Sequence, residues 1–282
     1  MINKGHIHIW VISASFMLSS CSTGFYLQHY PDLASDIFYR NVLSAEKHLD
    51  EGNEETFLKA VKLRTQYTYA FIVEEADRLI DDDYSGGKAL YGEALLSFEN
   101  AIEHGRYAIQ LRYPQLGKIT DWITSDIAFT NDDIPYLYWL AAAYGGAISS
   151  SRGKAKWIIQ LPIVGYLLET ALEIDPSWNY GALHSAMISY SMARTDLQGN
   201  NIKEARLNFR KSMRYSRRND GGAIVSFAEN VCVEEQNRDE FEKLLNVVIE
   251  MDVNKNKELK LGNVIARDRA NWLFSRTDEL FY

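Results

Sequence analysis

The 282-residue sequence predicts an all-α fold. Apolar residues recur three and four positions apart over long stretches, which is the spacing of one helix face. Strict alternation of apolar and polar residues, which would indicate strands, is hard to find. The prolines stand where the helical pattern begins or stops, so they leave long stretches free of helix breakers. They are Pro31, Pro114, Pro135, Pro162 and Pro176.

The first twenty residues have the features of an export signal. Lys4 gives a positive start, and residues 7–18 form an apolar run that is shorter than the roughly 20 residues of a membrane-spanning helix. The run ends in Leu18-Ser-Ser-Cys21, which resembles the lipobox cut by the bacterial lipoprotein signal peptidase. We therefore predict a signal peptide at 1–20, lipidation of Cys21 and a lipidated linker at 21–35.

The alternative is an ordinary buried cysteine after an apolar first helix. Charge, apolar run, small residues and cysteine occur in the order of a lipoprotein signal, which favours lipidation of Cys21. Each buried methylene of an acyl chain contributes about 0.8 kcal/mol, so several chains would anchor a soluble domain. Ser22 replaces the aspartate that would indicate inner-membrane retention, so we predict the outer membrane. No apolar run after Leu18 is expected to cross a membrane.

The rest of the chain is long for one compact core and suits a single helical array, which we predict over 36–282. The formal net charge is −8, and removal of Lys4 with the signal makes it one unit more negative. This charge argues against nucleic acid as a partner. If Cys21 is lipidated, Cys232 has no partner within the chain. Cys232 lies on an apolar helical face, which predicts a buried thiol and not a nucleophile.

A spacing of four then three residues recurs along the chain, first at Ala94, Phe98 and Ala101. Small residues at this spacing let a helix lie close to its neighbour, and the larger residue fills the groove. The pattern resembles the second helix of a tetratricopeptide repeat, with candidate first helices at 136–147, 179–193 and 223–233. An irregular helical bundle is the alternative. The later sets are Val164, Leu168 and Ala171; Ala205, Phe209 and Ser212; and Glu240, Leu244 and Val247.

Two segments resemble chemical sites but lack essential residues. Asp81-Asp-Asp-Tyr-Ser-Gly-Gly matches the opening of a calcium-binding loop, yet Gly92 stands where the bidentate glutamate is needed, so we predict a turn between two helices. Gly87-Lys88 lacks the hydroxyl and the first glycine of a phosphate loop. The histidines have no metal-ligand spacing, and no serine-hydrolase elbow is present. We therefore predict no metal, no cofactor and no catalytic residue.

The aromatic residues give the candidate binding sites. Aromatic side chains gather where helices are predicted to start, and concave helical-repeat surfaces often use such side chains to bind a partner or an apolar ligand. Packing in the core is the commoner fate of any one of them. The candidates for ligand or partner binding are Tyr136, Trp139, Trp157 and Trp178.

Residues 36–282 also resemble the T component of TRAP (tripartite ATP-independent periplasmic) transporters, a family of lipoproteins with degenerate tetratricopeptide repeats. No single motif is diagnostic alone, but the likeness extends over the whole domain. One departure from the family pattern is Gly262, where a small residue such as alanine is expected. The segments that carry it include Asn41-Val42, Gly52-Asn53, Glu75-Ala76-Asp77, Tyr138-Trp139, Leu161-Pro162, Asp175-Pro176, Gly262-Asn263-Val264-Ile265-Ala266, Arg269-Ala270, Trp272-Leu273 and Asp278-Glu279-Leu280-Phe281.

The resemblance implies a periplasm-facing lipoprotein that binds the solute-binding P component and forms homo-oligomers, commonly trimers, with a hydrophobic cleft or pore for an apolar small molecule. We therefore expect a non-enzymatic accessory component of a TRAP transporter. Two alternatives stay open. One is a repeat lipoprotein that serves as a scaffold for outer-membrane or cell-wall assembly complexes. The other is an enzyme built from scattered carboxylates, which a pocket of converging carboxylates would favour.

Overall fold

The computed structural model describes residues 31–123 and 127–282, and within these ranges it contains helices and no strand. The predicted all-α fold is confirmed. The predicted signal peptide and the predicted lipidation site Cys21 lie outside the described residues. The first described helix, α2, starts at Pro31.

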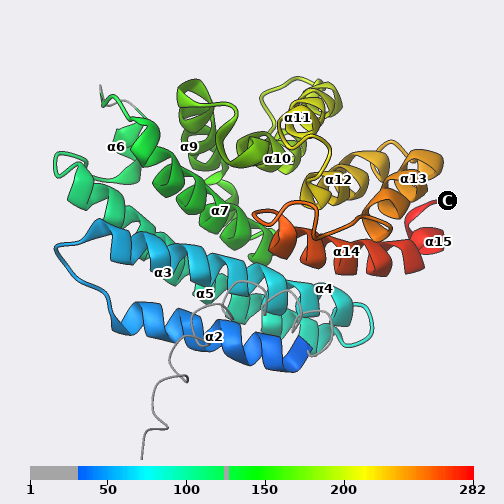
Figure 1. The fold of residues 1–282 in the computed structure, drawn as a ribbon, viewed down its shortest axis with the longest axis horizontal. Coiled ribbons are helices and arrows are strands. Elements are labelled where there is room, and N and C mark those ends of the chain that lie inside the picture. Colours follow the sequence, from blue (N-terminus) through cyan, green and yellow to red (C-terminus); the bar gives the residue numbers. More distant parts are fainter. Residues whose placement is uncertain (1–30, 124–126) are drawn as a thin grey trace, which may run out of the picture.

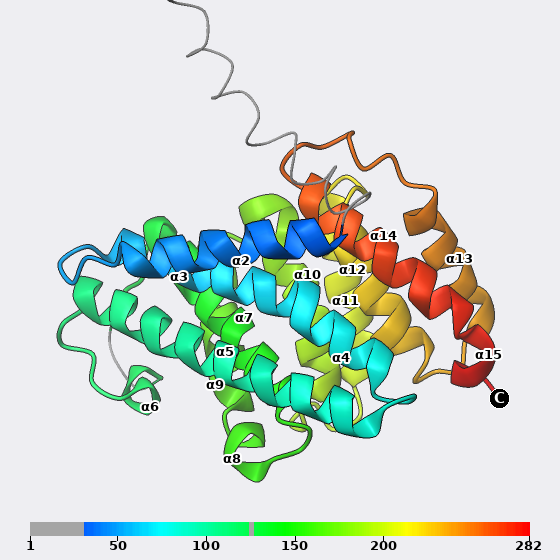
Figure 2. The same cartoon turned by 90° about the horizontal axis from the view of Figure 1, so that it is seen from below.

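Long antiparallel helices form the N-terminal part (Figures 1 and 2). The helix after α2 is continuous through a π-helical turn, η1, which inserts extra backbone into one long helix. It then returns as α5. These elements are α2 Pro31–Lys47, α3 Glu54–Tyr67, η1 Thr68–Val73, α4 Glu74–Leu79 and α5 Tyr84–Arg112.

The chain then continues as successive helical hairpins in an arc, and the long α14 returns to lie beside α4 (Figures 1 and 2). Short helices connect the hairpins. The elements are α6 Ile119–Trp122, η2 Asn131–Asp133, α7 Ile134–Ser150, α8 Ala155–Ile158, α9 Leu161–Ile174, α10 Trp178–Ala193, α11 Asn201–Tyr215, α12 Gly221–Phe227, η3 Ala228–Cys232, α13 Arg238–Ile249, α14 Lys260–Ser275 and α15 Thr277–Leu280.

The predicted repeat pattern corresponds to these hairpins. The three candidate first helices are α7, α10 and the α12–η3 helix, and each is followed by its predicted second helix, α9, α11 or α13. In α5 and α9 the predicted residues are buried, and in α11 Ala205 and Ser212 are buried while Phe209 is partly buried. Small residues allow the close approach, as at Gly146 of α7, where a Cβ would lie 2.3 Å from the Phe98 ring of α5.

The register predicted for α13 is wrong by one residue. Val247 is exposed, and Glu240 and Leu244 are only partly buried. The buried residues of α13 are Phe241, Leu245 and Val248, which have the same spacing of four then three. The polar first turn contains Glu240, which pairs with Arg206 instead of facing the core.

Two hydrophobic cores share one helix. The first core contains buried residues from Phe57 to Tyr190, and the second contains buried residues from Ile188 to Leu273. Leu183 and Met187 of α10 pack in the first core, whereas Ile188 packs in the second. The two halves of the array are therefore joined through α10.

One segment differs from the expectation that no later run could cross a membrane. Ala155–Ile174 has the length and mean hydropathy, 1.3, of a membrane-spanning helix. The structure divides it into α8 and α9, and Pro162 stands in the first turn of α9. The apolar side chains of α9, such as Leu167 and Leu168, are buried in the first core. Packing within the protein accounts for the apolar side chains of α9 that are buried, whereas Ile158 and Ile159 of the same segment are exposed.

The segment that resembles a calcium loop forms the predicted turn. Asp83 is the N-cap of α5 and accepts a hydrogen bond from the Gly86 N–H at 3.0 Å. Cys232 is fully buried in the second core, as predicted. Burial raises the pKa of its thiol to about 12, so the side chain is a neutral apolar group at neutral pH.

Candidate binding sites

Two of the four predicted aromatic residues meet where α7 lies beside α10. The Tyr138 ring centroid is 5.1 Å from that of Trp139 and 5.0 Å from that of Trp178. All three side chains are partly buried. We call Tyr138, Trp139 and Trp178 the α7–α10 aromatic cluster. It joins residues from two successive hairpins, so the packing of those hairpins fixes its shape.

The backbone after Trp178 is strained. Asn179, Tyr180 and Gly181 have φ angles of 45°, 59° and 83°, in the left-handed region that is unfavourable by about 1–2 kcal/mol for each residue with a Cβ. A Cβ on Gly181 would lie 2.9 Å from the Tyr215 Cβ of α11, so only glycine fits there. The contact between α10 and α11 therefore holds the turn that follows the Trp178 ring. Strained backbone of this kind often lies at functional sites.

Polar groups border the aromatic cluster. The ammonium group of Lys62 on α3 is 5.9 Å from the Trp139 ring centroid. Burial, and secondarily the negative charge of Asp220 at the N-cap of α12, raise the pKa of Tyr138 to about 12. The Tyr138 hydroxyl therefore stays protonated at neutral pH. The cluster presents aromatic faces with a neutral hydroxyl and a cation at its border, which suits an apolar or amphipathic binding partner.

Two residues near this position were not among the sequence candidates. Tyr138 stands beside Trp139 in the same aromatic run of the sequence, and this position is the signal that could have identified it. Tyr69 lies on η1; its hydroxyl donates to the Ala142 carbonyl at 3.0 Å, and 38% of the residue is exposed. The π-helical turn shifts the helix face at Tyr69, and the regular spacing of the sequence gives no indication of that shift.

Tyr136 is placed in the core and away from the cluster. It is 5% exposed, and the guanidinium of Arg112 stacks on its ring at 4.9 Å. Arg112 in turn donates to the buried carboxylate of Asp133 at 2.7 Å. Pro135 sets the first turn of α7, so Tyr136 points into this polar contact between α5 and α7. The structure gives Tyr136 a packing role.

Trp157 lines a separate pocket between α5, α6, α7 and α8. The pocket has a volume of about 460 Å3, within the range of about 300–1,000 Å3 that is usual for small-molecule sites. Its described lining contains three cationic side chains and no acidic one. We call it the α5–α8 pocket. Its lining residues are Ile102, Arg106, Lys118, Ile119, Tyr144, Lys156, Trp157 and Gln160.

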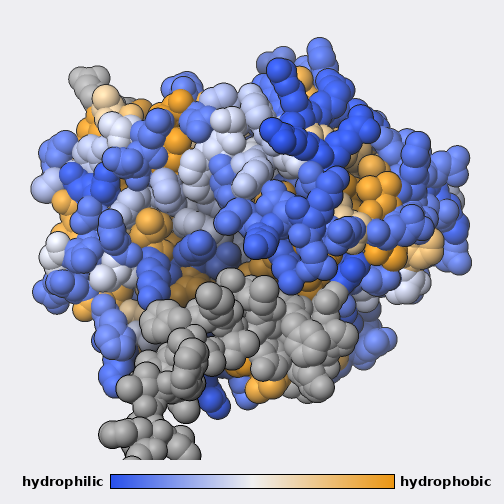
Figure 3. Space-filling view, viewed as in Figure 1, coloured by the Kyte–Doolittle hydropathy of each residue, from blue (hydrophilic) through white to orange (hydrophobic). Residues whose placement is uncertain are grey.

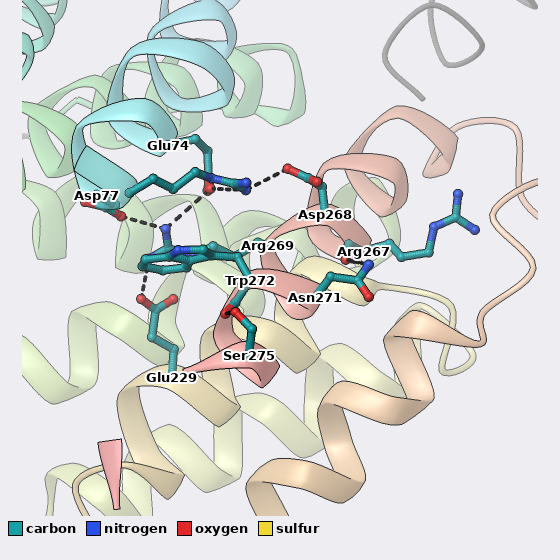
Figure 4. A network of polar contacts seen from close by, with 10 residues as sticks. Glu74, Asp77, Glu229, Arg267, Asp268, Arg269, Asn271, Trp272 and Ser275 are labelled. Atoms are coloured by element: carbon teal, nitrogen blue, oxygen red, sulfur yellow. Dashed lines mark hydrogen bonds and ion pairs between the residues drawn. The ribbon is translucent and has the colours of Figure 1, made fainter. Parts of the chain in front are cut away.

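A network of charges joins the two ends of the arc (Figure 4). Arg269 of α14 contacts Asp77 at 2.7 Å and Glu74 at 3.4 Å, and it reaches Glu229 at 2.5 Å. Its guanidinium also lies 4.4 Å from the Trp272 ring centroid. Asp77, Arg269 and Trp272 come from three of the segments that carry the family resemblance. The fold thus brings residues that are far apart in sequence into one contact.

Two further arginines in this network also form ion pairs. Arg78 contacts Asp268, and Arg276 contacts Asp81, each at 2.7 Å, so α4 and the turn after it are tied to α14. Burial raises the pKa of Glu74, while Arg269 and Arg78 oppose that rise. Among the described residues, no group of three or more His, Cys, Asp or Glu side chains is arranged to hold a metal ion.

The molecular surface is mostly hydrophilic on the face shown in Figure 3, with separate hydrophobic patches between charged side chains.

Comparison with known proteins now identifies the family. A model described as the TRAP transporter T-component matches residues 38–281, which is nearly the whole chain. The chain belongs to the TRAP transporter T-component family. It is also similar to an uncharacterized protein of Treponema pallidum (strain Nichols), with 21% identity over 228 residues that cover 78% of this chain and 70% of that protein.

Membership defines the general role of the chain. A TRAP transporter T component is an accessory protein of a transport system and does not belong to an enzyme family. It works as a periplasmic or membrane-associated component. The aromatic cluster and the α5–α8 pocket are two places in the described part of this T component with a geometry suited to binding.

Proposed function

We propose that this T component is a lipid-anchored protein facing the periplasm, which binds the solute-binding P component of its transporter and an apolar organic ligand. The anchor would be Cys21 in the outer membrane, and the helical domain would present the binding surface. The protein would form no covalent bond with the ligand. Association with further copies of the chain, as trimers, is part of this proposal.

The observation that carries the proposal is the α7–α10 aromatic cluster. Its three rings are only partly buried and are held by two hairpins and by the strained turn after Trp178. A preformed aromatic surface binds by removing apolar area from water without an additional ordering cost in the protein. Tyr and Trp residues contribute most to such interfaces because they combine large apolar faces with a polar group.

The ligand part is tested on the native lipoprotein. We expect that the protein, purified from its own membranes with the P component, contains an apolar organic molecule detectable by mass spectrometry after extraction. Recovery of the protein at physiological abundance, alone and without a bound molecule, would contradict the transport role. Recovery with an outer-membrane or cell-wall assembly complex in place of the P component would support the scaffold alternative.

The surface is tested by substitution. We expect the combined Trp139→Ala and Trp178→Ala variant to retain less than a tenth of the P component in co-purification, because the aromatic surface is lost. Lys62→Glu, which changes the charge beside Trp139 without entering a core, is a second variant that should also weaken recovery. Tyr84→Ala removes an exposed aromatic residue of α5 and is the matched control. Equal recovery with all variants would place the interface elsewhere.

A further inference from the structure

The α5–α8 pocket is a second place where the molecule could hold a ligand, distinct from the α7–α10 aromatic cluster. Both use α7, through Tyr144 and Tyr138 respectively. Six residues separate these tyrosines, so they point about 120° apart around the helix axis. The pocket therefore opens on another face of α7.

Arg106 is the unusual residue of this pocket. Its Nε atom is buried and has no hydrogen-bond partner. The part of the chain that the structure describes provides no hydrogen bond or ion pair to the Arg106 guanidinium. A buried polar atom without a partner is unfavourable by about 1–3 kcal/mol, and more for a charged group, so native proteins seldom keep one. Because Arg106 also lines the pocket, a ligand there is the group that would pair with its guanidinium.

The other lining residues divide the pocket into a cationic and an apolar part. Lys118 and Lys156 add positive charge, and Lys156 lies 3.6 Å from Glu99, which is not among the lining residues. The apolar part of the lining is formed by three largely buried side chains, Trp157, Ile102 and Ile119. The pocket therefore offers positive charge to the anionic group of a ligand and an apolar wall to the rest of that ligand.

We propose that the α5–α8 pocket binds a small organic carboxylate, whose anionic group pairs with Arg106 and whose apolar body packs against Trp157. The planar guanidinium presents parallel N–H donors that match both oxygens of a carboxylate. A neutral amide offers one carbonyl oxygen and no charge, so it pairs with Arg106 more weakly than a carboxylate does, and the pocket selects for the charged form. The volume is large enough for a ring or a short acyl chain beside the carboxylate.

The first experiment uses matched probes on the full chain in detergent, with binding measured by calorimetry. The probes are phenylacetate, 4-phenylbutyrate and octanoate, each paired with its neutral amide. We expect saturable binding of at least one carboxylate and at least tenfold weaker binding of its amide. Failure of all three carboxylates to bind, or equal binding of acid and amide, overturns the proposal.

The second experiment locates the bound probe. Arg106→Gln removes the charge and should weaken binding of the best probe at least tenfold. Arg106→Lys keeps a charge without the paired donors, so its affinity should lie between those of the unmodified chain and Arg106→Gln. Arg210→Gln changes an exposed arginine of α11 and should leave binding unchanged. Unchanged binding by Arg106→Gln overturns the proposal, and if that variant fails to fold, the acid–amide comparison on the unmodified chain still decides it.

These tests are independent of the P component. Arg106→Gln should leave co-purification of the P component intact, whereas the Trp139 and Trp178 variants should leave carboxylate binding intact. If only one of these two expected losses is observed, the proposal whose variant loses nothing is the one that has failed.

Discussion

Asp133 illustrates how single residues stabilise this fold. It is 1% exposed, and its carboxylate accepts hydrogen bonds from Arg112 at 2.7 Å, from Tyr113 at 2.5 Å and from the Thr130 backbone at 2.8 Å. Burial alone would raise its pKa, but the hydrogen bonds from Tyr113, Thr130 and Arg112 outweigh burial and lower it. The same carboxylate raises the pKa of Tyr113, after burial, to about 12.

We predict that Asp133→Asn lowers the free energy of unfolding by about 3 kcal/mol, because it removes the buried charge that binds the partly buried Arg112. A lowered folded-state pKa contributes stability above the ordinary value of 3.8, and that contribution is lost as the pH falls through the folded-state pKa. Urea unfolding should thus show a constant deficit for the variant at neutral pH and a shrinking deficit below pH 3.8. A deficit that does not change with pH would contradict the assigned charge.

The register of α13 can be tested at the scale of one helix. Val248 is fully buried, whereas its neighbour Val247 is 48% exposed. We predict that Val248→Ala lowers the free energy of unfolding by about 2 kcal/mol through the loss of buried methyl groups, while Val247→Ala changes it by less than about 0.5 kcal/mol. Denaturant unfolding of the two variants provides the comparison. Equal effects of the two substitutions would contradict the observed register and support the one in which Val247 faces the core.

This helix also shows what the sequence can predict. The spacing of four and three is periodic enough to locate the hairpins, because burial of one helix face requires it. In α13 two adjacent sets, Glu240 with Leu244 and Phe241 with Leu245, have that same spacing, and only the position of the neighbouring helices selects between them. The hairpins could therefore be predicted from local sequence, whereas the register could not.

The candidate sites divide in the same way. Trp139 and Trp178 could be selected as aromatic residues near helix starts, but their meeting through Tyr138 depends on the packing of α7 on α10. Tyr136 has the same sequence signal and lies under Arg112 instead. Arg106 has no signal at all in the sequence, since its importance arises from a missing partner in three dimensions.

The whole molecule is joined on one side by α10 and on the other by the Arg269 network between α4 and α14. Arg269 is 12% exposed and contacts three carboxylates. We predict that Arg269→Ala lowers the free energy of unfolding by about 3 kcal/mol, because three partly buried acids are left without their counter-ion. Arg238→Ala breaks ion pairs of a half-exposed arginine, whose charge the solvent screens, and should change stability far less. Similar values for the two variants in urea unfolding would mean that the network contributes little to joining the halves.

Attachment to a membrane is a property of the whole molecule that depends on one residue. The buried residues described for the two cores begin at Phe57, so we expect both cores to form without the acyl chains at Cys21. We predict that Cys21→Ser folds with an unchanged thermal unfolding midpoint yet moves from the membrane to the soluble fraction, since several acyl chains supply the proposed anchoring energy. Fractionation with and without detergent, together with mass spectrometry of the mature N-terminus, measures both effects. If the Cys21→Ser chain stays with the membrane in low and high salt, the anchor lies elsewhere, and the apolar α9 segment becomes the first place to examine.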